Sequence, residues 1–390
     1  MCSSPIGCLE MTGATLEANG ERSKDQFLPL ASHLAPVAFS CAALVLVFWG
    51  LFQLDLPIAR YMRSVTVDYV WARDQILIPW MATTSWAGDW IGDGEQLLLL
   101  SVLLLAIGWG AGRAPIIAAG WQTLLAHGLA GLLTNVFKHL IGRPRPRLVH
   151  SGGWLSMPSM QAGLDSFPSG HATASFAVAT VLARRFPAGA VLFYGIAGFV
   201  GLSRVLRGAH FPTDVAGGIF FGVLSGSLFA RPLREWRQSL AEGCFTSAIG
   251  MVYVFALMWV ISHPLAPIDW ETIAMVGAGS VLTILGAWFR VSWWISRAEP
   301  SETSVSRAAL IVITLGLALM SRSWLVTAAV ACVGAAYWLK WRNDPASTRA
   351  TTRMQRLVQE GVMVVGILLA LFVLWEGTGA FPIQWEVWNR

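Results

Sequence analysis

Three clusters of side chains between residues 138 and 214 are of the types that bind and transfer a phosphoryl group. They combine two histidines, three cations and one carboxylate. Arg145 and Arg204 can each present a planar fork to two phosphate oxygens, and Lys138 adds a compact ammonium. Such cations would neutralise a phosphate dianion and the charge that builds on its oxygens during transfer. Taken singly, Lys138 and Arg145 also fit cations that anchor the end of a membrane helix.

The second cluster is the tetrad Pro168-Ser169-Gly170-His171, which fits the beginning of a helix. Ser166 is the predicted N-cap, with Pro168 in the first turn. Gly170 would let the backbone approach a ligand, and free N–H groups at this helix end would bind an anion. His171 would then face that anion as a general acid. The alternative is a capped membrane helix with an interfacial histidine.

In the third cluster His210 and Asp214 are four residues apart. We expect the carboxylate to accept a proton from one ring nitrogen and to hold the other toward phosphorus, making His210 the nucleophile. A turn at Pro212 with a simple His-Asp hydrogen bond is the plainer alternative. A zinc site of His171, His210 and Asp214 is weaker, because the neighbouring cations would compete with a metal. No metal or other cofactor is therefore expected.

Composition places these clusters in a membrane protein. The 390 residues are 55% hydrophobic and only 13% charged, too apolar for a soluble protein of this length. The cations lie singly between apolar runs rather than on one basic face, so nucleic-acid binding is not expected. The five cysteines form no CxxC pair and are interpreted as unpaired. An all-α, polytopic integral membrane protein is predicted.

About eleven apolar runs are long enough to cross, or nearly cross, a bilayer. A polar, Trp-rich segment at 55–93 follows the first run, and part of it, 79–90, would lie in the membrane interface. The predicted runs are 34–52, 97–110, 115–140, 168–183, 188–202, 214–228, 247–261, 273–289, 308–320, 324–339 and 361–375. The ninth and tenth are separated by three residues, so they would form a tight helical hairpin.

The expected organisation is a cytoplasmic tail (1–30), a six-helix core (31–230) and a C-terminal region of about five further transmembrane helices (231–390). Placing the N-terminus in the cytoplasm also places most cationic loops there. All three clusters then emerge on the opposite side of the membrane and can converge. We expect an inner-membrane protein of a bacterium, with its active site facing the periplasm.

The three clusters together resemble the type 2 phosphatidic acid phosphatase superfamily, whose members include vanadium haloperoxidases and bacterial acid phosphatases. The matching signatures are Lys, six residues, Arg-Pro; then Pro-Ser-Gly-His; then Ser-Arg, five residues, His, three residues, Asp. The resemblance covers residues 34–228 and implies that His210 is the nucleophile, His171 the acid and Asp214 the orienting partner. It also implies a metal-free phosphate site, formed by Lys138, Arg145, Ser169, Gly170 and Arg204.

The resulting hypothesis is a membrane lipid phosphatase that forms a phosphohistidine. Its substrate would be the phosphate monoester or diphosphate of a lipid, such as undecaprenyl diphosphate, phosphatidic acid, phosphatidylglycerophosphate or lipid A. The alternatives are a phosphotransferase with another lipid or sugar as acceptor, a transporter or scaffold, and an inactive binding protein. A homo-oligomer formed through the C-terminal spans remains open. Four residues near the clusters are expected to be solvated in loops: Arg143, Arg147, His150 and Arg207.

Overall fold

Apolar helices make up nearly all of the chain that the computed structural model describes, namely residues 30–64, 66–67, 75–76, 79–149, 157–263, 269–295 and 304–343. Strands β1 (Thr66–Val67) and β2 (Gln75–Ile76) form one short antiparallel pair. The predicted all-α membrane architecture is confirmed. The helices are α2 (Leu30–Ser64), α3 (Pro79–Ile91), α4 (Gly94–Gly110), α5 (Ala114–Ile141), α6 (Gly170–Arg185), α7 (Ala190–Leu206), α8 (Pro212–Phe229), α9 (Trp236–Ser262), α10 (Trp270–Ile295), α11 (Ser304–Met320) and α12 (Trp324–Asn343).

Every apolar run predicted up to residue 339 corresponds to a helix, and the run at 361–375 lies outside the described residues. In the described part, six helices are long and apolar enough to cross a membrane. Helices α3 and α4 are bent by 50° at their junction and make a seventh span if they are counted together. The first helix continues to Ser64, past the end predicted at residue 52, so it includes the beginning of the polar segment predicted at 55–93.

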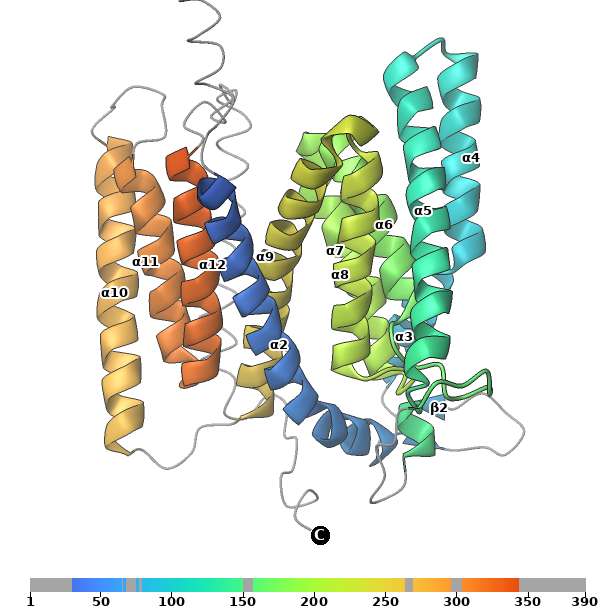
Figure 1. Ribbon diagram of the computed structural model, residues 1–390. Helices are drawn as coiled ribbons and strands as arrows, with labels where there is room; N and C mark the ends of the chain where they lie inside the picture. The colour runs from blue at the N-terminus through green and yellow to red at the C-terminus, as the bar shows by residue number, and fades with distance from the viewer. Residues whose placement is uncertain are drawn as a thin grey trace, which may run out of the picture.

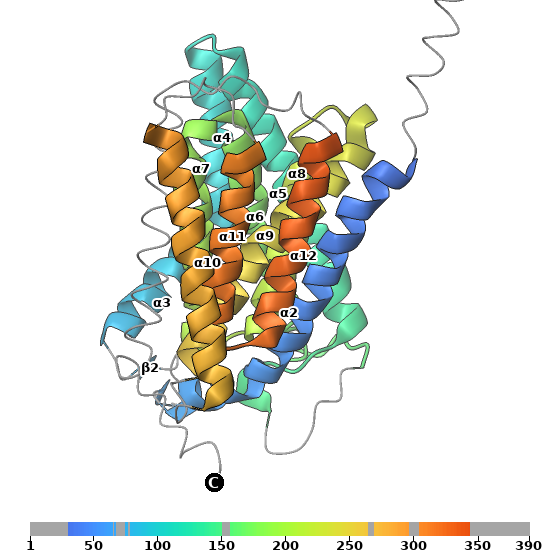
Figure 2. The same cartoon turned by 90° about the vertical axis from the view of Figure 1, so that its left-hand side faces the viewer.

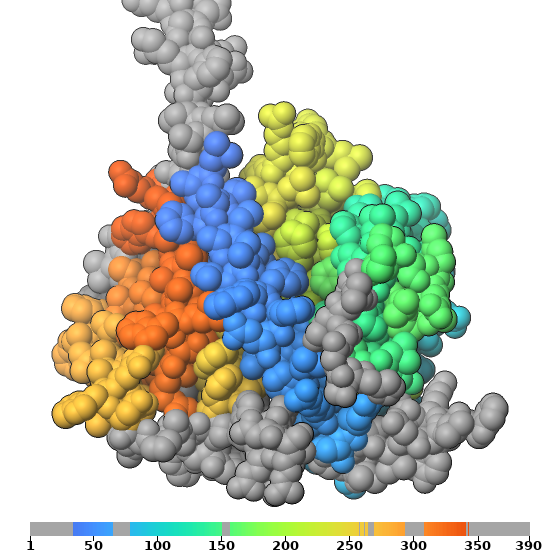
Figure 3. Space-filling view, turned by 60° about the horizontal axis from the view of Figure 1, so that its bottom comes forward, coloured from blue at the N-terminus to red at the C-terminus, as the bar shows by residue number. Residues whose placement is uncertain are grey.

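The helices pack as two groups with α2 and α9 between them (Figure 1). Helices α4 to α8 form one group, and α10, α11 and α12 form the other. Helix α2 packs against α8, α9 and α12. Figure 2 also shows α2 and α12 side by side. Seen from the lower end of the molecule, α2 runs between the C-terminal helices and the α5–α6 region (Figure 3). The domain boundary at residue 230 stays a prediction.

Three glycines of α8, spaced four residues apart, allow this helix to lie directly on the backbone of α6. A Cβ at Gly218 would come within 2.9 Å of the Ser169 carbonyl oxygen, and one at Gly226 within 2.5 Å of the Ala177 carbonyl oxygen. Gly222 faces α6 between them. Small residues at this spacing are typical of closely packed membrane helices. As a result, α6 and α8 begin side by side, and the backbone N–H of Ser169 donates to the carbonyl of Asp214 at 3.0 Å.

The segments that carry the three clusters meet at one end of the bundle, the lower end in Figure 1. Helices α5 and α7 end there, and α6 and α8 begin there. Gly142 ends α5 in the left-handed conformation, with φ of 58°, and its N–H donates to the carbonyl of Lys138. Only glycine takes up this conformation without strain. The chain can therefore turn directly after Lys138 and bring Arg145 back to the same end.

Candidate active site

His210 lies in the short segment between α7 and α8 and is almost fully buried. Its Nδ1 is 2.8 Å from the carbonyl oxygen of Ser166. Since a carbonyl can only accept, Nδ1 carries the proton and Nε2 keeps its lone pair. Asp214 Oδ2 is 3.7 Å from Nδ1, too far for a hydrogen bond. The predicted hydrogen bond from His210 to Asp214 was therefore wrong: Ser166 takes the ring proton, and Asp214 acts on the ring as a nearby charge.

The surroundings of His210 favour its neutral form. Burial lowers the pKa of this histidine, and the positive charges of Arg204 and Arg145 lower it further. Asp214 raises the pKa of His210, but the pKa stays lowered overall. A buried, neutral imidazole with a free Nε2 is suited to nucleophilic attack. The influence of both arginines also indicates that residues of the first and third clusters lie close to this ring.

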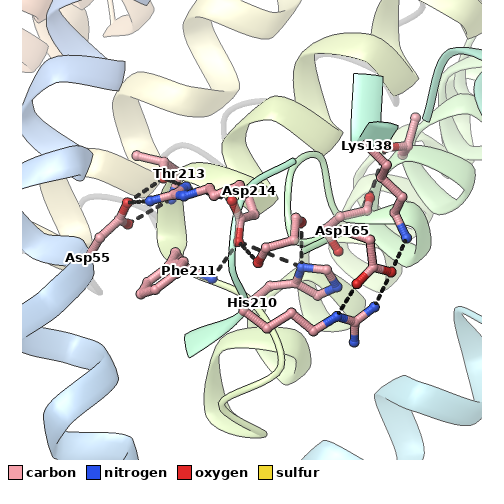
Figure 4. Close-up of polar contacts among 12 residues, drawn as sticks. Asp55, Lys138, Asp165, His210, Phe211, Thr213 and Asp214 are labelled. Carbon is pink, nitrogen blue, oxygen red and sulfur yellow. Dashed lines mark hydrogen bonds and ion pairs between the residues drawn. The ribbon is translucent and has the colours of Figure 1, made fainter. Parts of the chain in front are cut away.

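Lys138 and Arg145 share one carboxylate, that of Asp165. Arg145 donates to it from Nε and Nη2, both at 2.8 Å, and Lys138 Nζ lies 3.4 Å from Oδ2. The hydrogen bonds from Arg145 hold the pKa of Asp165 well below its usual range. This carboxylate lies on the opposite side of His210 from Asp55 (Figure 4). The two cations are thus held in a fixed orientation by an anionic group, as a phosphate would hold them.

A second carboxylate, Asp89 of α3, pairs with three basic groups. Arg204 and Arg207 each donate to it, and His171 Nε2 is 3.3 Å from its Oδ1. Arg207 was expected to be solvated, but its guanidinium forms this ion pair. The side chain of His171 is 30% exposed, whereas that of His210 is 3% exposed. His171 is therefore the more accessible of the two histidines.

The N-terminus of α6 was predicted correctly in place but not in detail. The helix begins at Gly170 with Ser169 at the N-cap, whereas Ser166 was the predicted N-cap. The hydroxyl of Ser166 instead donates to Asp214 Oδ2 at 2.5 Å. A Cβ at Gly170 would meet only Thr134, at an ordinary 3.5 Å. Packing against the described residues therefore does not require glycine at this position, and its role in binding a phosphate stays a prediction.

Among the buried polar atoms without a hydrogen-bond partner in the described residues are Ser169 Oγ and Arg204 Nε. Buried polar groups are nearly always paired, so such atoms need an explanation. Both lie in the clusters predicted to hold phosphate. A bound phosphate oxygen would supply the missing acceptor for each.

Four charged residues of the site were not assigned to it from the sequence: Asp55, Asp89, Asp165 and Arg143. Arg143 was expected to be solvated, which was wrong: it is 5% exposed and pairs with Asp55 and Asp214. Arg147, in the same loop, is exposed as expected. His150 lies outside the described residues. Within the described ranges, no three His, Cys, Asp or Glu residues are grouped so as to hold a metal.

Part of the chain is similar in sequence to known proteins. The model of the PAP2 superfamily matches residues 119–238. Lipid A 1-phosphatase of Rhizobium etli is 34% identical over 157 residues, which are 36% of this chain and 68% of that protein. The enzyme of the same name from Rhizobium johnstonii is 41% identical, over 36% of this chain and 64% of that protein. Phosphatidylglycerophosphatase B of Bacillus subtilis is 32% identical over 48% of this chain and 96% of its own length.

No solved structure matches the chain. The family model covers the end of α5, the tetrad at the start of α6 and the His210 segment, which are the parts that form the site. The relative from Bacillus subtilis is matched along almost its entire length, so the likeness extends beyond the short signatures. On these grounds the chain belongs to the PAP2 superfamily.

Proposed function

We propose that this protein is a membrane lipid phosphatase that transfers the phosphoryl group of its substrate to His210 and then to water. The observation that carries the proposal is the pair of buried atoms Ser169 Oγ and Arg204 Nε, which have no partner among the described residues, together with a buried histidine whose pKa is lowered by burial and by Arg204. Buried hydrogen-bond donors that find no acceptor in the described part of the chain favour a ligand with several acceptor oxygens. A phosphoryl group has that character.

In the first step Nε2 of His210 attacks phosphorus. A nitrogen–phosphorus bond forms, the bond from phosphorus to the leaving oxygen breaks, and His171 gives its proton to that oxygen. In the second step water attacks phosphorus, His171 takes a proton from it, and the bond to His210 breaks. Arg145, Arg204 and Lys138 stabilise the charge on the remaining phosphate oxygens in both steps.

Asp165 and Asp89 fit this scheme as partners that hold the cations in position before substrate arrives. Each carboxylate is bound by groups that would also bind phosphate. Because both are partly exposed, a dianionic phosphate can compete with them for the same donors. The cations then need little rearrangement when substrate binds, which keeps the entropic cost of ordering them low.

The substrate is expected to be a phosphate monoester or diphosphate of a lipid, held at the end of the bundle where the site lies. The similar proteins named above act on lipid A and phosphatidylglycerophosphate, and undecaprenyl-diphosphatase BcrC of Bacillus subtilis is 31% identical over 35% of this chain. With the N-terminus in the cytoplasm, that end of the bundle faces the periplasm. The inner membrane of a bacterium is accordingly the proposed location.

The test is phosphate release by the purified full-length protein in detergent. The substrates are lipid A, phosphatidylglycerophosphate, undecaprenyl diphosphate and phosphatidic acid, with His210→Ala as the blank. We expect release from at least one lipid and none from the variant. Turnover by His210→Ala would contradict the covalent mechanism. A labelled phosphoenzyme without phosphate release would instead indicate transfer to an acceptor, the phosphotransferase alternative.

A further inference from the structure

Arg143 lies between two buried carboxylates from distant parts of the chain. Its Nη1 donates to Asp214 Oδ1 at 2.6 Å, and its Nη2 donates to Asp55 Oδ2 at 2.7 Å. The side chains of both aspartates are 0% exposed and that of Arg143 is 6% exposed. Figure 4 shows this network reaching from Asp55, on α2, to Asp214 beside His210. Charges so deeply buried are costly unless they are paired.

Asp55 also binds the beginning of α8. Its Oδ1 accepts the backbone N–H of Thr213 at 3.0 Å, and its Oδ2 accepts the Thr213 hydroxyl. Arg143 Nη1 lies 2.5 Å from the same hydroxyl oxygen. The guanidinium therefore contacts Asp55, Thr213 and Asp214 at once. Thr213 directly precedes Asp214 in sequence. Asp55 therefore holds Arg143, which pairs with the Asp214 carboxylate, and also the backbone next to Asp214.

The two oxygens of Asp214 have separate partners. Oδ1 accepts from Arg143, whereas Oδ2 accepts from the Ser166 hydroxyl at 2.5 Å and the Phe211 N–H at 2.8 Å. Oδ2 is also the atom that faces His210 Nδ1, at 3.7 Å. The carboxylate cannot rotate without breaking these bonds. The guanidinium of Arg143 further lies over the ring of Phe211, 4.4 Å from its centroid, next to the nucleophile in sequence.

We infer that Asp55 and Arg143 are positioning residues, which hold the Asp214 carboxylate in the orientation that directs His210 toward phosphorus. The inference rests on the proposed function, because it assigns a role in the same site. Neither residue belongs to the groups that bind phosphate there. Losing either one should therefore slow formation of the nitrogen–phosphorus bond while leaving substrate affinity nearly unchanged, which a purely structural clamp would not do.

The first experiment compares Arg143→Gln and Asp55→Asn with Arg147→Gln, the control in the same loop. Steady-state kinetics on the preferred lipid phosphate and thermal unfolding in detergent are measured for each full-length variant. For the two buried positions we expect kcat to fall roughly 10–100-fold with KM within about threefold of the original, as for supporting residues of other catalytic sites. Arg147→Gln should leave both constants unchanged. Wild-type kcat in folded Arg143→Gln and Asp55→Asn would overturn the inference.

A double-mutant cycle separates positioning from stability. If Arg143 acts through Asp214, Arg143→Gln should slow phosphoenzyme formation less than about threefold when Asp214→Asn is already present. In the wild-type protein the same substitution should slow it far more. A double variant whose fold-loss in the rate of phosphoenzyme formation equals the product of the two single losses would overturn the inference. If Arg143→Gln does not fold, the same cycle is run with Asp55→Asn, which keeps the shape of the side chain. An active His210→Ala would refute the proposed function itself, whereas an inactive His210→Ala with multiplicative losses would refute only the positioning role.

Discussion

Gly218 determines how closely α8 approaches α6 at the active-site end. A Cβ at this position would lie 2.7 Å from the Ala172 Cβ and 2.9 Å from the Ser169 carbonyl oxygen. Carbon atoms in favourable contact are about 3.5 Å apart, so Gly218→Ala would push the helices apart by roughly 1 Å. Neither neighbouring atom can rotate away. The overlap should cost about 1–3 kcal/mol, which the better helix propensity of alanine offsets by about 1 kcal/mol.

The effect on catalysis should exceed the effect on stability. A shift of 1 Å between catalytic groups can lower the rate by about 10²-fold, and here it would separate His210, just before α8, from His171 in the first turn of α6. The matched control is Gly198→Ala in α7, where a Cβ meets no atom within 4 Å. We expect kcat for lipid phosphate hydrolysis to fall about 10²-fold in Gly218→Ala, with a modest loss of thermal stability. If both variants keep the same kcat, the close approach of α6 and α8 does not set the geometry of the site.

Three further predictions concern the chemistry. Because burial lowers the pKa of His210, activity should be retained at neutral pH and lost only as pH falls through a value below the ordinary 6.5; an acid limb of kcat/KM at or above 6.5, after correction for substrate titration, would contradict this. His171→Ala should slow hydrolysis of alkyl phosphates by about 10²–10⁴-fold and of aryl phosphates with good leaving groups far less; equal losses would exclude a general-acid role. Phosphate release should be unchanged by excess EDTA, and a loss restored by a divalent ion would revive the zinc alternative.

Much of the fold could be predicted because a bilayer imposes strong constraints on the chain. A helix that crosses it must satisfy its own backbone and expose apolar side chains, so the apolar runs mark the helices. The three clusters could be assigned to one end for a related reason: successive spans reverse direction, which places the end of α5 and the starts of α6 and α8 together. The end of α2 could not be predicted in this way, because the helix continues past residue 52 although the apolar run stops there.

Three carboxylates of the site, those of Asp55, Asp89 and Asp165, could not be predicted, because they lie outside the sequence motifs. Asp89 comes from α3, and Asp165 lies in the loop before the tetrad. Their roles depend on how helices pack, which local sequence does not encode. One signal was present for Asp55: an acidic residue at the edge of an apolar run is costly unless it is paired. That argument predicts a partner for Asp55 but does not identify Arg143 as that partner.

Helix α2 connects the C-terminal helices to the catalytic carboxylate. A Cβ at Gly50 of α2 would meet the ring of Phe255 in α9 and the side chain of Leu325 in α12, so both helices approach the α2 backbone closely. Phe255 is fully buried in the core that these helices share. Asp55 lies little more than one helical turn beyond Gly50 and holds Arg143. Because a packed interior transmits displacement rather than absorbing it, any loosening of α9 or α12 would shift Asp55 and, through Arg143, the carboxylate beside the nucleophile. Of the helices that follow the phosphatase signatures in sequence, α9 and α12 thus pack directly against the helix that carries Asp55.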